Sequence, residues 1–410
     1  MNCVKILGAG LAGSEAALQL LHAGIPVEIY DIKPKKLLPV YQKDTYCELV
    51  CNNSLGSLSL STPLGLLLSE LEFLNSRVIG IAKKSMLKDT NTLSVDKTLF
   101  SNNVTSELKA RGAKFHCECV QQIPDGHEPL IIATGPLTSK KLVTNIANQY
   151  NLKNYTFSDA SSPVIDGSSI QYNDRQLQKL SDDLFVLNIP NDVFNTFFNS
   201  LLSLKSNNHH SIDHSSKLFQ CQTLEYIAKQ GKTSLISSRF TYNGNDKPVL
   251  LLRRETALRD AFILVGCTTA LRHKEQLALF SMLPTLQNVK FIKYGRQHRN
   301  TFFRTPGILN PFFQVKTQKR EIYIVGQLSG LDGYAPAIAS GYIAARKIIN
   351  KEKMKELPHE TMIGALAKYV SDVNVVDYQP MCASFSLLQK NKQDIIKEDS
   401  LQSLSAYLNQ

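Results

Sequence analysis

The feature that most constrains the fold is a glycine-rich turn near the N-terminus, set between an apolar run and a helical pattern. Residues 4–7 are mostly apolar, and Gly8-Ala9-Gly10-Leu11-Ala12-Gly13 follows them directly. Apolar residues then recur at helical spacing to about residue 24, and residues 27–32 (VEIYDI) have the pattern of a second strand. This order of strand, glycine turn, helix and strand predicts a βαβ unit and a parallel sheet.

Each glycine of the turn has a chemical reason to be there. Gly8 permits the tight turn, Gly10 lets a pyrophosphate approach the backbone, and Gly13 lets the helix pack closely on the sheet. Amide groups at the N-terminus of the helix favour the phosphates. Asp31 follows Gly13 by 31 − 13 = 18 residues, where a carboxylate can accept hydrogen bonds from ribose hydroxyls. We therefore predict a dinucleotide bound by Gly8, Ala9, Gly10, Leu11, Ala12, Gly13 and Asp31.

Two later segments favour FAD over a simple nicotinamide site. An apolar strand runs into Ala133-Thr134-Gly135, and a second one at 322–325 runs into Gly326-Gln327 with a helix after Gly333. Both resemble elements of large FAD proteins, so Thr134, Gly135, Gly326 and Gln327 are predicted to contact the cofactor. The alternative is that both are simply buried strands of an α/β sheet. Since no second glycine motif is present, NAD(P)H is expected only as a transient reductant.

The order of the elements predicts two domains, one of them built from both ends of the chain. At 410 residues, the chain exceeds what one hydrophobic core usually serves. We expect an α/β class: a Rossmann-like FAD-binding domain at 1–155 and 310–410, with an inserted α+β domain at 156–309 that binds the substrate. No apolar stretch approaches the length of a membrane span, so we expect a cytoplasmic protein without membrane contact.

The cysteines indicate reactive thiols and not a disulfide scaffold or a metal site. There are eight of them without CxxC spacing, and Cys117 and Cys119 have no second ligand pair nearby. The histidines at 209–214 are interpreted as part of a solvated loop, and no metal is expected. Cys51 and Cys221 are candidate nucleophiles, since a thiolate is the strongest nucleophile among side chains. The alternative for each is a small buried apolar residue.

A basic segment between residues 250 and 304 favours a nucleic-acid partner for a chain of net charge +11. Ten basic residues stand there against three acidic ones, and Tyr294, Phe302 and Phe303 are interleaved. Basic side chains can hold phosphates while aromatic ones stack on an extruded base. The alternative is a solvated basic face. The ten are Arg253, Arg254, Arg259, Arg272, Lys274, Lys290, Lys293, Arg296, Arg299 and Arg304, and the three are Glu255, Asp260 and Glu275.

Taken in order, several motifs resemble one family. They are GAGLAGSEAA (8–17), CELVCNNSL (47–55), IIATGPLTS (131–139), the cysteine before Glu225 with KQGKTSL (229–235), YGRQHRNTF (294–302), GQLSGLDGY (326–334) and YQPMCASF (378–385). The chain resembles the folate- and FAD-dependent RNA uracil-5-methyltransferases known as TrmFO, and more distantly the longer MnmG-type flavoproteins. The chain differs from the family pattern at Asn52, Gly56 and Thr223.

The resemblance implies a methyl transfer to C5 of a uridine in RNA. It implies that Cys51 and Cys221 are catalytic, one adding to C6 of uracil and the other assisting proton removal or protecting the flavin adduct. Methylenetetrahydrofolate would supply the carbon through reduced FAD, and Glu225 and residues 298–300 become candidates for the active-site wall or for phosphate contacts. The T-loop uridine of tRNA is the expected target. The alternatives are a 23S ribosomal RNA uridine, a flavin-stabilised RNA-binding protein without catalysis, and an oxidoreductase for a small molecule.

Overall fold

The fold is taken from a computed structural model of the chain. It describes residues 3–38, 41–88, 91–173, 175–204, 222–242, 244, 247–256, 260–316, 320–388 and 396–409. The candidate nucleophile Cys221, Arg259 of the basic segment and the histidine tract at 209–214 lie outside these residues. Within them, none of the helices combines the length and the apolar character needed to cross a bilayer.

A five-stranded parallel sheet joins the two ends of the chain, in the order β15-β6-β1-β2-β5. Its strands are β15 (Ile322–Ile324), β6 (Leu130–Ile132), β1 (Val4–Leu7), β2 (Val27–Asp31) and β5 (Lys114–Cys117). Side chains alternate between its two faces, so Ile6 enters the core shared with the helices α1 (Leu11–His22), α4 (Lys97–Ala110) and α10 (Tyr334–Asn350). Leu7 enters the core under α5 (Lys140–Tyr150). The predicted α/β class with a Rossmann-like parallel sheet is confirmed.

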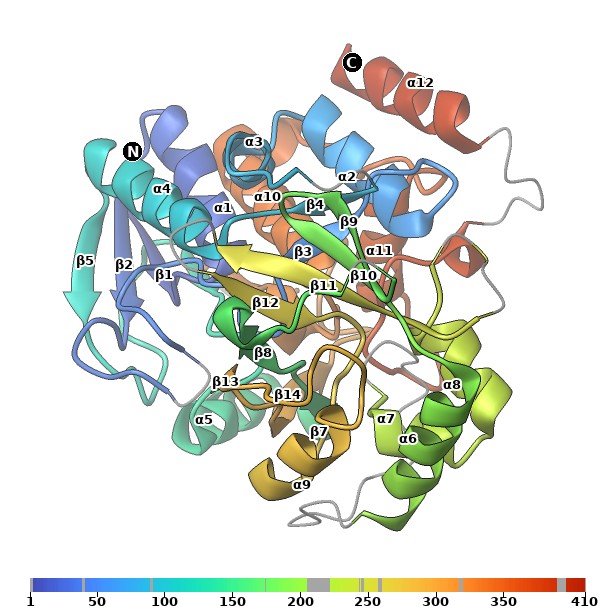
Figure 1. Cartoon of the computed structure of the whole chain (residues 1–410). Helices are drawn as coiled ribbons and strands as arrows, with labels where there is room; N and C mark the ends of the chain where they lie inside the picture. Colours follow the sequence, from blue (N-terminus) through green and yellow to red (C-terminus); the bar gives the residue numbers. More distant parts are fainter. Residues whose placement is uncertain are drawn as a thin grey trace.

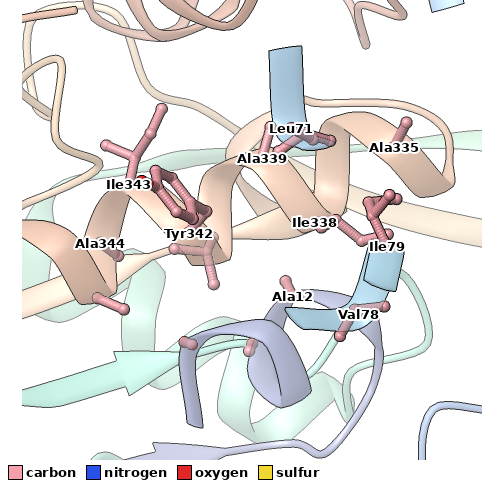
Figure 2. Packing of buried hydrophobic residues seen from close by; sticks show 14 of the residues in the cluster. Ala12, Leu71, Val78, Ile79, Ala335, Ile338, Ala339, Tyr342, Ile343 and Ala344 are labelled. Atoms are coloured by element: carbon pink, nitrogen blue, oxygen red, sulfur yellow. The ribbon is translucent and has the colours of Figure 1, made fainter. Parts of the chain in front are cut away.

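Helices α1 and α10 pack against each other so closely that backbone meets backbone. A Cβ atom added at Gly341 would lie 2.1 Å from the carbonyl oxygen of Ala12, a distance that real side chains do not reach. Figure 2 shows Ala12 of α1 beneath Ile338 and Ala339 of α10. Small residues therefore bring α1, which follows the first strand of the parallel sheet, into contact with α10, which follows its last strand in the sequence.

The leucine-rich segment after Pro63 forms two helices. These are α2 (Pro63–Phe73) and α3 (Arg77–Lys84). The chain breaks between them because Asn75 adopts a positive φ of 61° and Ser76 caps α3 by accepting from the amide of Ile79. This part is completed by a two-stranded antiparallel pair, β3 (Ser54–Ser57) with β4 (Thr92–Ser94), and by the helices α11 (Met362–Ser371) and α12 (Ile396–Leu408).

A six-stranded antiparallel sheet occupies the middle of the chain, in the order β13-β8-β12-β11-β10-β9 (Figure 1). Its strands are β8 (Val164–Asp166), β9 (Leu177–Ser181), β10 (Leu184–Asn188), β11 (Val249–Thr256), β12 (Ala261–Leu264) and β13 (Phe291–Lys293). A second core lies between this sheet and the helices α6 (Asn191–Ser203), α7 (Leu224–Ala228), α8 (Lys232–Arg239) and α9 (His273–Phe280). A separate antiparallel ladder pairs β7 (Lys153–Ala160) with β14 (Gln297–Arg304). We propose the boundaries 1–155, 156–309 and 310–410 for the two domains, with this ladder at the junction.

A buried carboxylate ties α2 to α11 and α12, and its protonation should affect stability. Glu70 is fully buried, accepts from the amides of Met362 and Ile363, and accepts from the hydroxyl of Ser400. Burial raises the pKa of Glu70 from 4.5 to about 7. Because the folded pKa lies above the unfolded one, the stability from this group is present below about pH 4.5 and is lost as the pH rises through 7.

We predict that Glu70→Gln removes this pH dependence. The loss of unfolding free energy between pH 4.5 and 7.5 should be smaller in the variant by an amount on the order of 3 kcal/mol, since one pKa unit corresponds to about 1.4 kcal/mol. Urea unfolding at the two pH values measures it. Glu72→Gln, an exposed residue of the same helix paired with Lys83, is the control and should unfold like the parent at both pH values. Equal pH dependence in the parent and Glu70→Gln would contradict the prediction.

Candidate active site

The glycine turn lies at the carboxyl end of β1, where parallel α/β sheets bind their ligands. Gly8 has a φ of 95°, and a Cβ atom there would lie 2.5 Å from the carbonyl oxygen of Ala133. A Cβ atom at Gly13 would lie 2.0 Å from the carbonyl oxygen of Gly8. At Gly10, the N-cap of α1, an added Cβ atom would meet nothing within 4 Å. Gly8 and Gly13 are thus required by the packing of the chain, whereas Gly10 faces open space beside the helix N-terminus.

The other residues predicted to bind the cofactor gather around this turn. Thr134 and Gly135 follow β6, and the Cα atom of Thr134 would lie 2.9 Å from a Cβ atom at Gly8. Gly326 and Gln327 begin the 3₁₀ turn η3 (Gly326–Ser329) after β15, and a Cβ atom at Gly326 would lie 3.4 Å from the Cβ atom of Ala12. Three strands, far apart in the sequence, therefore end beside the glycine turn at the N-terminus of α1.

Asp31 and the loop after it are fastened to the glycine turn. The carboxylate of Asp31 accepts from the amide of Ala9 at 2.8 Å and from the amide of Lys33 at 2.9 Å. The amide of Cys47 donates to the carbonyl of Ala9 at 2.9 Å. Because Cys47 lies four residues before Cys51, this hydrogen bond holds the loop that carries the predicted nucleophile against the glycine turn.

Cys51 lies at the N-terminus of α10 with its backbone held by a half-buried tyrosine. The hydroxyl of Tyr334, the first residue of α10, accepts from the amides of Cys51 at 2.8 Å and Asn52 at 3.3 Å. The ammonium group of Lys293 donates to the carbonyl of Val50 at 3.1 Å. Burial raises the pKa of the Cys51 thiol well above its ordinary value, and burial lowers the pKa of Lys293 to about 8.

A carboxylate that the sequence analysis missed faces the thiol of Cys51. Asp159 of β7 lies opposite His298 of β14 in the antiparallel ladder, and Asn300 lies two residues along on the same face. The Sγ atom of Cys51 lies 3.8 Å from Oδ2 of Asp159, Nε2 of His298 lies 3.3 Å from it, and Nδ2 of Asn300 donates to it at 3.2 Å. Of the residues expected to form the active-site wall, His298 and Asn300 thus lie beside Cys51. Arg299 points outward and donates to the hydroxyl of Thr156.

We interpret this cluster as a hydrogen-bonded group and not as a metal site. The nearest donor and acceptor atoms of Cys51, Asp159 and His298 lie within 4.8 Å of one another, a spacing that would also accommodate a cation. The three contacts to Oδ2 of Asp159 already account for this spacing. The nearby Lys293 ammonium acts electrostatically on Cys51 and disfavours a further positive charge.

Two residues in the segment after Cys221, Thr223 and Glu225, make hydrogen bonds that stabilise the local fold, which the motifs did not predict. Glu225 was a candidate for the active-site wall, but one of its carboxylate oxygens accepts from Thr269 and from the amide of Ala270. Thr223 caps α7 by accepting from the amide of Tyr226. At a second departure from the family pattern, Gly56 has a φ of 145°, and a Cβ atom there would lie 3.0 Å from Leu64. The backbone of β3 therefore favours glycine at that position.

The basic segment does not form one continuous face. Arg253 is buried and donates to Asn53, and Arg254 pairs with Asp183 and Asp260. The interleaved aromatic residues cannot stack on a base as expected, since Phe302 and Phe303 are buried in the core. Tyr294 is half-buried and stacks on His273 at 4.1 Å and on Phe291 at 4.6 Å. Among the described residues of this segment, the exposed basic side chains are Arg272, Lys274, Lys290, Arg296 and Arg299.

Comparison with known proteins places the chain in a family. The family model described as "Glucose inhibited division protein A" matches residues 3–356. A methylenetetrahydrofolate--tRNA-(uracil-5-)-methyltransferase TrmFO of Bacillus pumilus is 34% identical over 95% of this chain and 94% of its own length. Proteins of the same name from Enterococcus faecalis and Listeria monocytogenes are each 34% identical over 94% of this chain and 91% and 92% of their own lengths.

The chain belongs to the TrmFO family.

The solved structures similar to this chain agree at the level of the fold. GidA of Aquifex aeolicus superposes with a TM-score of 0.76 in one crystal form and 0.71 in another, at 14% and 15% sequence identity. The match covers 99% of this chain and 75% and 73% of the GidA chains. The predicted membership of the TrmFO family is therefore confirmed by the relatives, and the predicted fold by its structural neighbours.

We predict that Tyr334→Phe destabilises the loop of Cys51. Its hydroxyl is the acceptor for two amides in a partly buried place, and an unsatisfied buried donor costs about 1–3 kcal/mol. Chemical denaturation should show a loss of that size. The control is Tyr323→Phe, because the buried hydroxyl of Tyr323 has no hydrogen-bond partner among the described residues and its loss should be neutral or stabilising. Equal losses of unfolding free energy in the two variants would show that the two hydrogen bonds accepted by Tyr334 do not stabilise the protein.

Proposed function

We propose that the protein is a folate-dependent tRNA (uracil-5-)-methyltransferase that uses bound FAD. The observation that carries this proposal is the near full-length relation to the TrmFO relatives, together with the position of Cys51. Cys51 lies on a loop that is hydrogen-bonded to the glycine turn through Cys47. The N-terminus of α10 and the ladder of β7 with β14 both contact Cys51. This position supports the proposal, because the loop of Cys51 is bonded to the glycine turn that we propose to bind the cofactor.

The residues around the glycine turn fit FAD. Gly8, Ala9, Gly10, Leu11, Ala12 and Gly13 would hold the pyrophosphate at the N-terminus of α1, where the open space at Gly10 admits it. Asp31 would accept from the ribose hydroxyls. Thr134, Gly135, Gly326 and Gln327 would line the part of the cofactor toward α10. Bound reduced FAD supplies the relay and the electrons that convert the folate carbon into a methyl group, and NAD(P)H would reduce it again.

The chain's own residues supply a nucleophile and control of protons. C5 of uracil is a poor nucleophile until a thiolate adds to C6, which makes the base an enolate. Cys51 and Cys221 are the proposed pair for this addition and for handling the proton that leaves C5. Asp159 and His298 lie beside the first of them and can exchange protons within the hydrogen-bonded cluster.

The exposed basic side chains of α9 and of the strands after it support an RNA substrate. Arg272 and Lys274 at the start of α9 and Arg296 and Arg299 near β14 are all exposed, and β14 also carries His298. Phosphates bound by these residues would hold an RNA next to Cys51. The names of the relatives specify tRNA. No observation favours the 23S ribosomal RNA alternative, a protein without catalysis or a small-molecule oxidoreductase.

The direct test is methyl transfer from labelled methylenetetrahydrofolate with FAD and NAD(P)H, using unmodified tRNA and, in parallel, a 23S ribosomal RNA fragment. We expect label in 5-methyluridine of the tRNA. Cys51→Ala and Cys221→Ala should each lower the rate at least about a hundredfold, while Cys119→Ala, an exposed cysteine, should leave it unchanged. Label in the ribosomal fragment alone would overturn the tRNA assignment. Flavin binding without transfer to either RNA would overturn the activity.

The glycine turn gives a second prediction that separates binding from folding. Gly10→Val places its side chain in open space, so the variant should fold normally and yet lose bound flavin because the pyrophosphate is displaced. Gly13→Val should fail to fold stably, because its Cβ atom would collide with the backbone at Gly8. Flavin absorbance of the purified proteins and thermal unfolding measure the two effects. A Gly10→Val protein that retains its flavin would contradict the cofactor assignment.

A further inference from the structure

We propose that an open hollow beside Tyr155 binds an unpaired nucleobase of the RNA substrate, away from the uridine that is methylated. The inference rests on the proposed function, in which an RNA lies against Cys51. It adds a contact for a base to the phosphate contacts that the exposed basic side chains would make.

The hollow lies where the chain turns from α5 into β7 (Figure 1). Asn151 ends α5 in the left-handed conformation, with a φ of 52°, and Leu152 is buried in the core below it. The chain therefore turns at once and leaves the first side chains of β7 at the surface. The hollow has a volume of about 580 Å³ and is lined by Ala147, Asn148, Asn151, Leu152, Lys153, Asn154 and Tyr155.

The polar side chains of the hollow suit the edge of a base. Asn148, Asn151 and Asn154 are exposed, and their amide groups make no hydrogen bond to a described residue. Each amide offers two donor hydrogens and a carbonyl acceptor, which complement the donors and acceptors on the edges of nucleobases. The described residues that line the hollow include no acidic side chain, and the exposed Lys153 adds a positive charge.

Tyr155 supplies an aromatic surface on which a base can stack. Its side chain is 44% exposed, and its ring stacks on Phe302 of β14 with the ring centroids 5.7 Å apart. Phe302 is 5% exposed, so it supports the tyrosine ring from the protein side. The tyrosine is therefore already ordered while much of its ring remains available. Bases of every kind stack on such a ring, because each has a π-face.

The register of the ladder connects this hollow to the candidate active site. Tyr155 pairs with Phe302. Asp159 pairs with His298, four residues away along each strand. Side chains four residues apart in a strand lie on the same face, at a separation of about 13 Å. An RNA with its target uridine at Cys51 can therefore reach Tyr155 with a base a few nucleotides away.

The charges around the hollow favour a base inside it and phosphates beside it. The C-terminus of α5 carries a partial negative charge, which disfavours a phosphate, whereas its carbonyls can accept from the amino groups of a base. Arg299 is exposed and donates to the hydroxyl of Thr156, the neighbour of Tyr155. Lys153 and Arg299 can therefore bind the phosphates that flank the base.

The test measures the affinity of the flavin-bound, full-length protein for unmodified tRNA, by fluorescence anisotropy between about 50 and 200 mM salt. The variants are Tyr155→Ala, Tyr155→Phe and Lys153→Ala. The matched control is Phe73→Ala, which removes a ring of nearly equal exposure, 42%, from α2. Thermal unfolding and flavin absorbance check that each variant is folded.

We expect Tyr155→Ala to raise the Kd for tRNA at least about fivefold without changing its dependence on salt, because stacking releases no counterions. Tyr155→Phe should keep the affinity of the parent, since the ring remains. Lys153→Ala should reduce the slope of log affinity against log salt by about one. Phe73→Ala should bind like the parent.

An unchanged affinity in Tyr155→Ala, or an equal loss in Phe73→Ala, would show that the hollow does not bind RNA. A change in the oligomeric state of Tyr155→Ala at unchanged tRNA affinity would also overturn the proposal, because the hollow would then be a contact between copies of the chain. Weaker tRNA binding by Tyr155→Ala in a protein that methylates no RNA would overturn the proposed function and leave the base-binding hollow standing.

Discussion

Close contact between α1 and α10 is the constraint on which the arrangement of the proposed cofactor site depends. At Gly341, the backbone of α10 lies against the carbonyl of Ala12, and at Gly13 the backbone of α1 lies against the glycine turn. Neither approach is possible with a larger side chain at those positions. The two helices begin at Leu11 and Tyr334. Their close packing brings Gly326, which leads into α10, against Ala12 of α1, and Tyr334 holds the Cys51 loop next to them.

The inserted sheet is joined to the parallel unit by buried polar contacts, which explains why part of the basic segment is unavailable to RNA. Arg253 donates to Asn53, which in turn donates to the carbonyl of Arg254. Lys97 of α4 pairs with Glu255 at 3.1 Å, and both side chains are buried. Groups of this kind are costly to leave unpaired, so they define one way for the two parts to dock. A cleft beside this junction is lined by Gln42, Lys43, Glu48, Lys97, Thr98, Glu255, Thr256 and Ile292.

The local parts of this structure could be predicted from the sequence, whereas the long-range pairs could not. The glycine turn, the strands around it and the helix after Gly333 follow from spacing and from the special φ values of glycine. The cysteine motif likewise led to Cys51 through the family. Asp159 could not be found in this way, because its importance comes from pairing with His298, 298 − 159 = 139 residues later. Nor could composition show that Phe302 and Phe303 are turned into the core. The position of Cys221 and the domain boundaries remain predictions.

The contact at Gly341 also bears on the order in which this protein can form during synthesis. The chain makes α1 first, but the surface of α1 that receives α10 stays uncovered until more than three hundred further residues have been added. The strand β15, which completes one edge of the parallel sheet, arrives equally late. A nascent chain therefore carries an exposed apolar helix face through most of translation, and the antiparallel sheet can close on its own core in the meantime. Docking of the last segment then converts two partly formed units into one protein, with Gly326 against α1.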